Sequence, residues 1–186
     1  MKKVVLTFGL LSGAVFVANF LFLMPFGLSY ETSEILGYTS MFFAFLLVFF
    51  GIRSYRDNVA GGTIAFGKAF RVGILITLIS CVMCVAAWEV YFYNFNPDFM
   101  ETYAKRVVAK KRAEGATPAE VAATEKKMAD FAKLYKNPLV NVGISFLEVF
   151  PVGLVMTLLS AAILRRKEPR PGQGAAKAAA LHILCP

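Results

Sequence analysis

The sequence predicts an all-α membrane protein with four transmembrane helices. Of its 186 residues, 58% are hydrophobic, whereas soluble domains contain about 45–50% apolar residues. Only 17% are charged, these cluster between long apolar runs, and the mean hydropathy is +0.61. Each run is close to the roughly 20 residues that a helix needs to cross a bilayer. The pattern therefore indicates an integral membrane protein, with the lipid bilayer as its first partner.

The four predicted spans are residues 4–26, 35–52, 72–93 and 139–164. The first follows Lys2 and Lys3, as the apolar part of a signal peptide would. It is longer than the roughly 7–15 apolar residues of a secretory signal, and it does not end in small residues at a cleavage site. We therefore interpret it as an uncleaved first helix.

The basic residues near the span ends predict the orientation. Lys and Arg precede the first span, surround the second connection and follow the fourth span, whereas the first connection carries only Glu31 and Glu34. The positive-inside rule then places both termini in the cytoplasm. The third connection is basic on balance and opposes this mildly, but residues close to the span ends carry more weight. An aromatic group that includes Trp88 and Tyr91 fits an interfacial belt on the outer side.

The third connection predicts an extracytoplasmic helical hairpin over residues 96–136. Asn96 is expected to cap its first helix, with a proline following it. Thr117 to Glu120 form a capping-box pattern that predicts the start of the second helix. We expect residues 1–167 to form one domain and residues 168–186, which are rich in Gly, Ala and Pro, to be a disordered tail.

Glu89 and Glu148 lie inside predicted spans, where a carboxylate costs roughly 2.5–3.5 kcal/mol. Asn141, Ser145 and Glu148 share one face of the fourth helix, and Asn19 of the first helix lies at a comparable depth. One hypothesis is that these residues form a polar pocket in the outer half of the bilayer. The alternative is structural, with protonated glutamates and amides that form hydrogen bonds between helices.

Three further patterns have two interpretations each. The first is the cytoplasmic group Arg53, Arg56, Lys68 and Arg71, called here the basic rim, which suits anionic lipid headgroups or simply sets topology and anchors helices. Cys81 and Cys84 have redox spacing, but mid-span they are expected to be apolar fillers. Gly9 and Gly13 form a GxxxG motif that permits close contact within the subunit or in a homo-oligomer.

The composition excludes several classes of function. The single histidine, His182, lies in the C-terminal tail, so no histidine-based triad or haem site can form in the body of the chain. The net charge of +8 comes from residues that flank spans, and no nucleic-acid-binding motif is present. We expect no catalytic residue, metal or cofactor.

Several short segments resemble a known family. These are FFGIRSYRD at residues 49–57, GG at 61–62, FGKAF at 66–70, NPDF at 96–99, YKNP at 135–138 and FPVGL at 150–154. Over roughly residues 1–167 the chain is similar to a bacterial family of small integral membrane proteins known only as a domain of unknown function. The resemblance implies four helices, a long extracytoplasmic connection between the last two and a place in the bacterial inner membrane. It implies no activity or site residue.

The leading hypothesis is a membrane protein whose pocket around Glu89 and Glu148 binds or passes a proton, a cation or a small ligand. The alternative is a structural or assembly subunit that acts through helix packing and the outer hairpin. An intramembrane enzyme is the least favoured, because no nucleophile constellation is recognisable.

Overall fold

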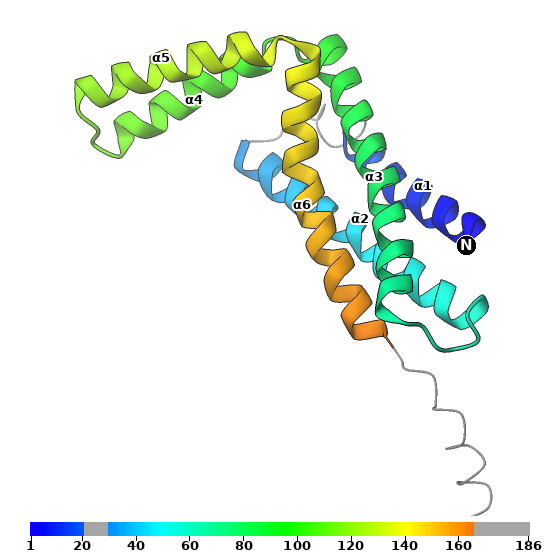
Figure 1. Ribbon diagram of the computed structural model, residues 1–186. Helices are drawn as coiled ribbons and strands as arrows, with labels where there is room; N and C mark the ends of the chain where they lie inside the picture. Colours follow the sequence, from blue (N-terminus) through cyan, green and yellow to red (C-terminus); the bar gives the residue numbers. More distant parts are fainter. Residues whose placement is uncertain (21–29, 166–186) are drawn as a thin grey trace, which may run out of the picture.

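The computed structural model describes residues 1–20 and 30–165, and within these ranges the chain forms six α-helices (Figure 1). They are α1 (Lys2–Ala18), α2 (Tyr30–Asn58), α3 (Phe66–Phe95), α4 (Phe99–Ala113), α5 (Pro118–Tyr135) and α6 (Pro138–Leu164). Three segments are long and apolar enough to cross a membrane, namely Ile35–Asn58, Phe66–Phe95 and Pro138–Leu164. The prediction of an all-α protein with membrane-like helices is therefore confirmed.

Two predictions fall partly or wholly outside the described ranges. The first span was predicted over residues 4–26, and α1 accounts for it as far as Ala18, but residues 21–26 lie outside the described part of the chain. The predicted disordered tail, residues 168–186, lies outside it entirely. The third and fourth predicted spans fall within α3 and α6, each of which begins earlier than the prediction.

Helices α1 and α3 touch closely and run in the same direction. A Cβ added at Gly9 would lie 2.9 Å from the Cβ of Ile79, and one added at Gly13 would lie 2.8 Å from the Cβ of Met83. Advancing four residues along α1 therefore advances four residues along α3. The GxxxG motif is used inside the subunit, where the missing side chains let two helix backbones approach.

Helix α6 runs antiparallel to α3, and α2 runs antiparallel to α1. The hydroxyl groups of Thr77 and Thr157 are hydrogen-bonded at 2.8 Å across the α3–α6 contact. Ser12 of α1 donates to the carbonyl oxygen of Ala44 in α2 at 2.7 Å. The four long helices thus alternate in direction, and the start of α1 and the end of α6 lie toward the α2–α3 connection, away from the hairpin.

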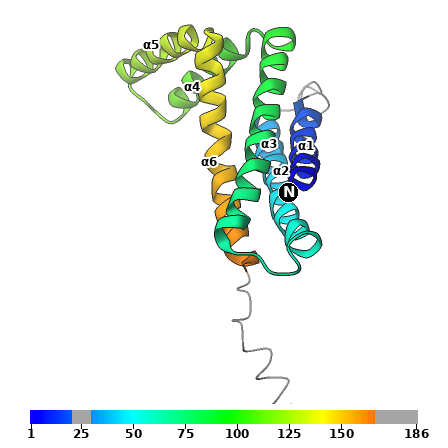
Figure 2. The ribbon, with the colours of Figure 1, turned by 45° about the vertical axis from the view of Figure 1, so that its right-hand side comes forward.

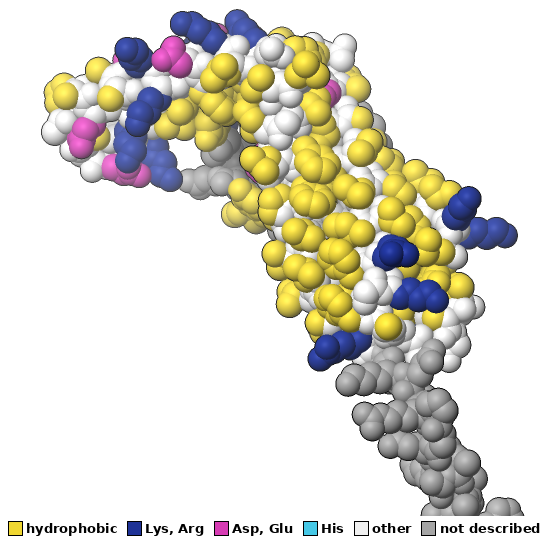
Figure 3. All heavy atoms as spheres, viewed as in Figure 1, with side chains coloured by type: hydrophobic (Ala, Val, Ile, Leu, Met, Phe, Trp, Pro, Cys, Tyr) yellow, Lys and Arg dark blue, Asp and Glu magenta, His cyan; other side chains and the backbone are white. Residues whose placement is uncertain are grey.

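Apolar side chains fill the centre of the bundle and also cover its outside. Phe45, Val48, Ile52, Val72 and Ile76 are fully buried. Figure 3 shows apolar side chains over the bundle surface, with Lys and Arg concentrated on the hairpin and toward the opposite end. A bundle that is apolar both inside and outside is suited to lipid rather than water.

The hairpin α4–α5 projects sideways from the end of the bundle where α3 finishes and α6 begins (Figures 1 and 2). The capping box at its second helix is confirmed, since the Thr117 N–H donates to Glu120 Oε2 at 2.8 Å and the Glu120 N–H donates to Thr117 Oγ1 at 3.4 Å. The expected cap at Asn96 is wrong. The Asn96 N–H closes the last turn of α3 by donating to the Tyr91 carbonyl at 3.1 Å, and Asp98 is the residue before α4.

Candidate ligand-binding cavity

An open cavity of about 610 Å³ lies between the hairpin and the adjacent end of the bundle. All six helices contribute to its wall, because the hairpin and the ends of the long helices face one another across the cavity. Its lining is strongly aromatic. The aromatic residues are Phe16, Phe20, Tyr38, Trp88, Tyr91, Phe99, Tyr103, Phe131 and Tyr135.

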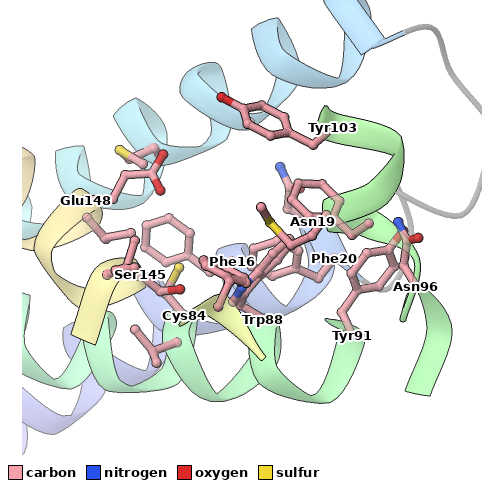
Figure 4. A pocket seen from close by; sticks show the side chains of 18 of the residues that line it. Phe16, Asn19, Phe20, Cys84, Trp88, Tyr91, Asn96, Tyr103, Ser145 and Glu148 are labelled. Carbon is pink, nitrogen blue, oxygen red and sulfur yellow. The ribbon is translucent and has the colours of Figure 1, made fainter. Parts of the chain in front are cut away.

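Trp88 is the centre of the aromatic lining (Figure 4). Its ring centroid lies 5.0 Å from that of Phe99 in an edge-to-face arrangement, 5.6 Å from that of Phe20 and 6.0 Å from that of Tyr91. Such pairs each add about 0.5–1.5 kcal/mol beyond the burial of their area. The indole of α3 thereby contacts α4 and the segment just after α1 at one side of the cavity.

A polar network connects the same tryptophan to α5 and α6. The Trp88 Nε1–H lies 3.0 Å from the hydroxyl oxygen of Tyr135 and 3.2 Å from Oδ1 of Asn141. The Ser145 hydroxyl donates to the same Asn141 oxygen at 3.2 Å. Asn141 is fully buried, and its Nδ2 has no hydrogen-bond partner among the described residues. A donor left unsatisfied in this way costs about 1–3 kcal/mol, so the network holds more hydrogen-bonding capacity than the described residues use.

The pKa of the Tyr135 phenol, which lies beside Trp88, is shifted. Burial raises the pKa of its phenol above the ordinary value of 10.0, hydrogen bonds with Ser145 and Trp88 lower it in part, and the charges of Glu148 and Glu89 raise it further. The phenol therefore stays protonated at neutral pH and remains a hydrogen-bond donor beside the cavity.

Asn19 lies where α1 meets α2. Its side-chain amide donates to the Ser40 hydroxyl, and the Ser40 hydroxyl donates in turn to the carbonyl oxygen of Gly37 at 2.8 Å. Asn19, Ser40 and Gly37 all line the cavity. Asn19, Ser145 and Glu148 thus line the same cavity, and their joint role as a binding site stays a prediction.

Among the described residues that line this cavity, Glu148 is the only one with a carboxylate, and it projects from α6. Figure 4 shows its carboxyl group in the space that Asn19 and Tyr103 border from α1 and α4. Its side chain is exposed, so the expectation of two buried glutamates is wrong for Glu148. The physical reason is its position at the edge of the α3–α6 seam, where α6 faces the hollow under the hairpin instead of a neighbouring helix.

Glu89 is outside the lining of the cavity. Its side chain is partly buried, and Oε1 has no hydrogen-bond partner among the residues that the structure describes. One residue corresponds to about 100° around a helix, so the Trp88 ring takes the side of α3 that faces the cavity and Glu89 points elsewhere. Of the five predicted pocket residues, the cavity lining contains Asn19, Ser145 and Glu148, while Asn141 lies behind it in the Trp88 network.

The helix registers nevertheless put the five residues at nearly one level of the bundle. The α1–α3 register, in which Gly9 meets Ile79, makes Asn19 level with Glu89. The α3–α6 register, in which Thr77 meets Thr157, makes Glu89 level with Ser145. Asn141 and Glu148 are each within about one helical turn of that level. The level of each residue along the bundle was therefore predictable from the sequence, whereas the direction in which its side chain points was not.

Sequence reasoning missed the aromatic part of the site. The sequence indicates an interfacial belt for Trp88 and Tyr91, and in the structure both line the cavity together with Phe131 and Tyr135 of the hairpin. Cys84, Trp88 and Tyr91 follow an i, i+4, i+7 spacing, which marks one face of α3. That spacing, together with the aromatic stripe of the hairpin helices, was the available signal.

A family model described as "Protein of unknown function (DUF4199)" matches residues 7–166. The chain belongs to this family. The match extends over α2 to α6 and most of α1, and it includes all the residues that line the cavity. The predicted resemblance to a family of unknown function is thereby confirmed. No curated protein and no solved structure matches the chain, so arguments about function rest on the geometry.

The matched region also contains the basic rim. Arg56 Nε lies 2.7 Å from Oδ1 of Asp57, and Arg53 Nε lies 3.7 Å from Oδ2 of the same carboxylate. The Lys68 ammonium lies 6.0 Å from the ring centroid of Tyr55. One carboxylate thus partly neutralises two of the four cations, while Arg71 is exposed. Anionic lipid binding by the rim remains a prediction.

Proposed function

We propose that this protein crosses the membrane four times and binds a small ligand in the cavity between the hairpin and the bundle. The cavity itself carries the proposal. Its volume of about 610 Å³ falls within the roughly 300–1,000 Å³ typical of ligand pockets, which are largely apolar with a few converging polar groups. Here the apolar wall is aromatic, and the polar groups include Glu148, Asn19 and Ser145.

The packing of α1 supports its role as the fourth span. Leu6, Leu10 and Leu11 are each about half exposed, as expected for the lipid-facing side of a helix. The α1–α3 register makes Lys2 level with Val72, beside Arg71. Basic residues from three segments therefore gather at the end away from the hairpin. This supports cytoplasmic termini, with the cavity in the outer half of the membrane.

The core of the bundle favours binding over passage. On the side of the cavity that faces away from the hairpin, Phe45, Val48 and Ile76 are fully buried and packed together. Interiors packed to this degree leave few voids larger than a water molecule. A single copy therefore has its binding space at one end and closely packed side chains beyond it.

A cavity-filling variant tests the proposal. Gly37 lines the cavity, and a Cβ added there would meet nothing within 4 Å, so Gly37→Leu is chosen to add bulk at the cavity wall. Gly143 is equally unobstructed but lies outside the cavity lining, which makes Gly143→Leu the matched control. Trp88 is the only tryptophan of the chain, so its fluorescence reports on the cavity alone.

We expect acrylamide to quench Trp88 in lipid nanodiscs, and we expect Gly37→Leu, but not Gly143→Leu, to reduce that quenching. Native mass spectrometry of the protein released from its own membranes should show a bound small molecule that only Gly37→Leu loses. If Gly37→Leu changes neither measurement, the cavity does not bind a ligand. A role as an assembly subunit that acts through its helices and hairpin would then be the better account.

A further inference from the structure

The residues that line the cavity also indicate the chemical class of its ligand. We propose that it binds an organic cation, an ammonium or similar group with apolar substituents, whose charge lies beside Glu148 among the aromatic rings. This inference rests on the proposed function, because it requires that the cavity be a binding site. The Glu148 carboxylate and the aromatic wall define this ligand class.

The first step is the position of the Glu148 carboxylate. It belongs to a membrane-like helix and lies three residues, less than one turn, from the middle of α6. Within residues 1–20 and 30–165, no Lys, Arg or His forms an ion pair with it. A carboxylate at this depth needs a proton, a polar partner or a cation. The cavity is the space from which such a partner can reach it.

The second step is the chemistry of the wall around that carboxylate. The faces of Trp, Tyr and Phe attract cations through the ring quadrupole, and Trp does so most strongly. Aromatic cages of this kind recognise quaternary ammonium groups. Trp88, Tyr91 and Tyr103 line the space together with Glu148 (Figure 4), so a cationic head would find both a counter-charge and ring faces there.

An inorganic cation fits this site less well. Ca²⁺ takes about 6–8 oxygen ligands and Mg²⁺ needs a near-octahedral set. In the described ranges, no three His, Cys, Asp or Glu side chains come together, and Glu148 is the single carboxylate of the lining. A bare metal ion would also leave most of the roughly 610 Å³ and nearly all the aromatic surface unused.

Among the described residues of the lining, Arg106 is the other charged one, and its charge opposes a bound cation. It lies on α4, which is not one of the candidate membrane spans, whereas Glu148 belongs to one, so in a membrane water and salt would screen Arg106 more than Glu148. The hairpin and the bundle thus bring opposite charges to the two sides of the cavity. We place the cationic group of the ligand on the bundle side, next to Glu148.

The test uses probes of similar size and opposite charge with purified protein in nanodiscs of neutral lipid. Benzyltrimethylammonium is the cation, phenylmethanesulfonate the anion and benzyl alcohol the neutral probe, each titrated against Trp88 fluorescence. We expect saturable binding of the cation and about tenfold weaker binding in Glu148→Gln, which corresponds to the loss of one effective ion contact. Glu89→Gln makes the same chemical change outside the lining and should bind the cation as the wild type does.

Each outcome bears on the inference. The cation assignment is supported if the wild type prefers the cation, Glu148→Gln abolishes this preference and Glu89→Gln keeps it. Equal binding of the three probes, or binding that Glu148→Gln leaves unchanged, overturns the cation assignment while the cavity remains a ligand site. Absence of saturable binding by any probe, with no effect of Gly37→Leu on acrylamide quenching, overturns both the assignment and the proposed function.

Discussion

The indole N–H of Trp88 lies 3.0 Å from the hydroxyl oxygen of Tyr135, and this contact joins a membrane-like helix to the hairpin that covers its end. Tyr135 is the last residue of α5, and Trp88 lies two turns before the end of α3. The ring of Phe92 packs between the two helices, with its centroid 5.4 Å from that of Tyr135. The position of the hairpin, and with it the shape of the cavity, therefore depends on a few side chains at one junction.

Replacement of Trp88 by Phe should loosen the hairpin. Phe keeps an aromatic ring but loses the N–H that reaches both Tyr135 and Asn141, and each lost hydrogen bond is worth about 0.5–1.5 kcal/mol. We expect faster amide hydrogen exchange in α5 together with a lower melting temperature in detergent. Tyr93→Phe is the matched control, because its hydroxyl is exposed and lies 3.5 Å from the Lys136 carbonyl. Equal exchange rates in the two variants would contradict the prediction.

Replacement of Gly9 by Ala should destabilise the bundle. The new methyl group would lie 2.9 Å from Cβ and Cγ2 of Ile79, and a β-branched side chain cannot easily turn away. Overpacking of this kind typically costs about 1–3 kcal/mol. In contrast, Gly143→Ala meets nothing within 4 Å and should be neutral or stabilise α6 by about 0.5–1 kcal/mol through helix propensity.

Unfolding titrations in mixed micelles measure both glycine variants, and light scattering reports their oligomeric state. Because Gly9 packs against α3 of the same chain, we expect Gly9→Ala to lower stability without changing the molecular mass of the particle. A variant of unchanged stability that shifts a dimer to a monomer would show that the GxxxG motif acts between subunits.

The sequence predicted where the helices lie because hydropathy and capping are local properties. Four of the six helices follow from apolar runs, and the start of α5 follows from the hydrogen bonds that Thr117 and Glu120 exchange. Asn96 shows the limit of this reasoning. Its side chain suits a helix start, but its backbone N–H finishes α3 first, so the competition between adjacent helices decided the boundary.

For the candidate site, the sequence could predict only how far along its helix each residue lies. Hydropathy fixes how far along a span Glu89 and Glu148 lie, but rotation about the helix axis depends on which large side chain takes the packed face. At α3 that side chain is Trp88, which contacts Phe99 of the hairpin. The cavity brings residues of the hairpin opposite residues of α1 and α2. This is a long-range arrangement, and no local pattern in the sequence encodes it.

The hydrogen bond between Thr77 and Thr157 should show strong coupling in a double-mutant cycle. The two hydroxyls lie 2.8 Å apart and are fully buried. Thr77→Val or Thr157→Val alone leaves one buried hydroxyl without its partner, at a cost of about 1–2 kcal/mol. In Thr77→Val/Thr157→Val both hydroxyls are absent, so the loss should be smaller than the sum. Additive losses would mean that each hydroxyl is satisfied by its own helix, as threonine permits.

The hairpin should lose stability in acid. Hydrogen bonds from the Thr117 backbone and side chain hold the pKa of Glu120 below its ordinary value of 4.5, and the Lys105 ammonium does the same for Glu101. A carboxyl whose pKa is lowered in the folded state binds protons more readily when unfolded. Its contribution is therefore complete above pH 4.5 and is lost as the pH falls through the lowered folded pKa.

We expect amide exchange in α4 and α5, corrected for intrinsic pH dependence, to accelerate as the pH drops from about 5 to 3. Glu120→Gln provides the control, because glutamine can still accept the Thr117 N–H through its amide oxygen but cannot be protonated in this range. The variant should lose the acid dependence around the start of α5 while keeping that of the Glu101–Lys105 pair in α4. An identical acid profile at α5 in both proteins would show that the capping-box carboxylate does not control the stability of this helix.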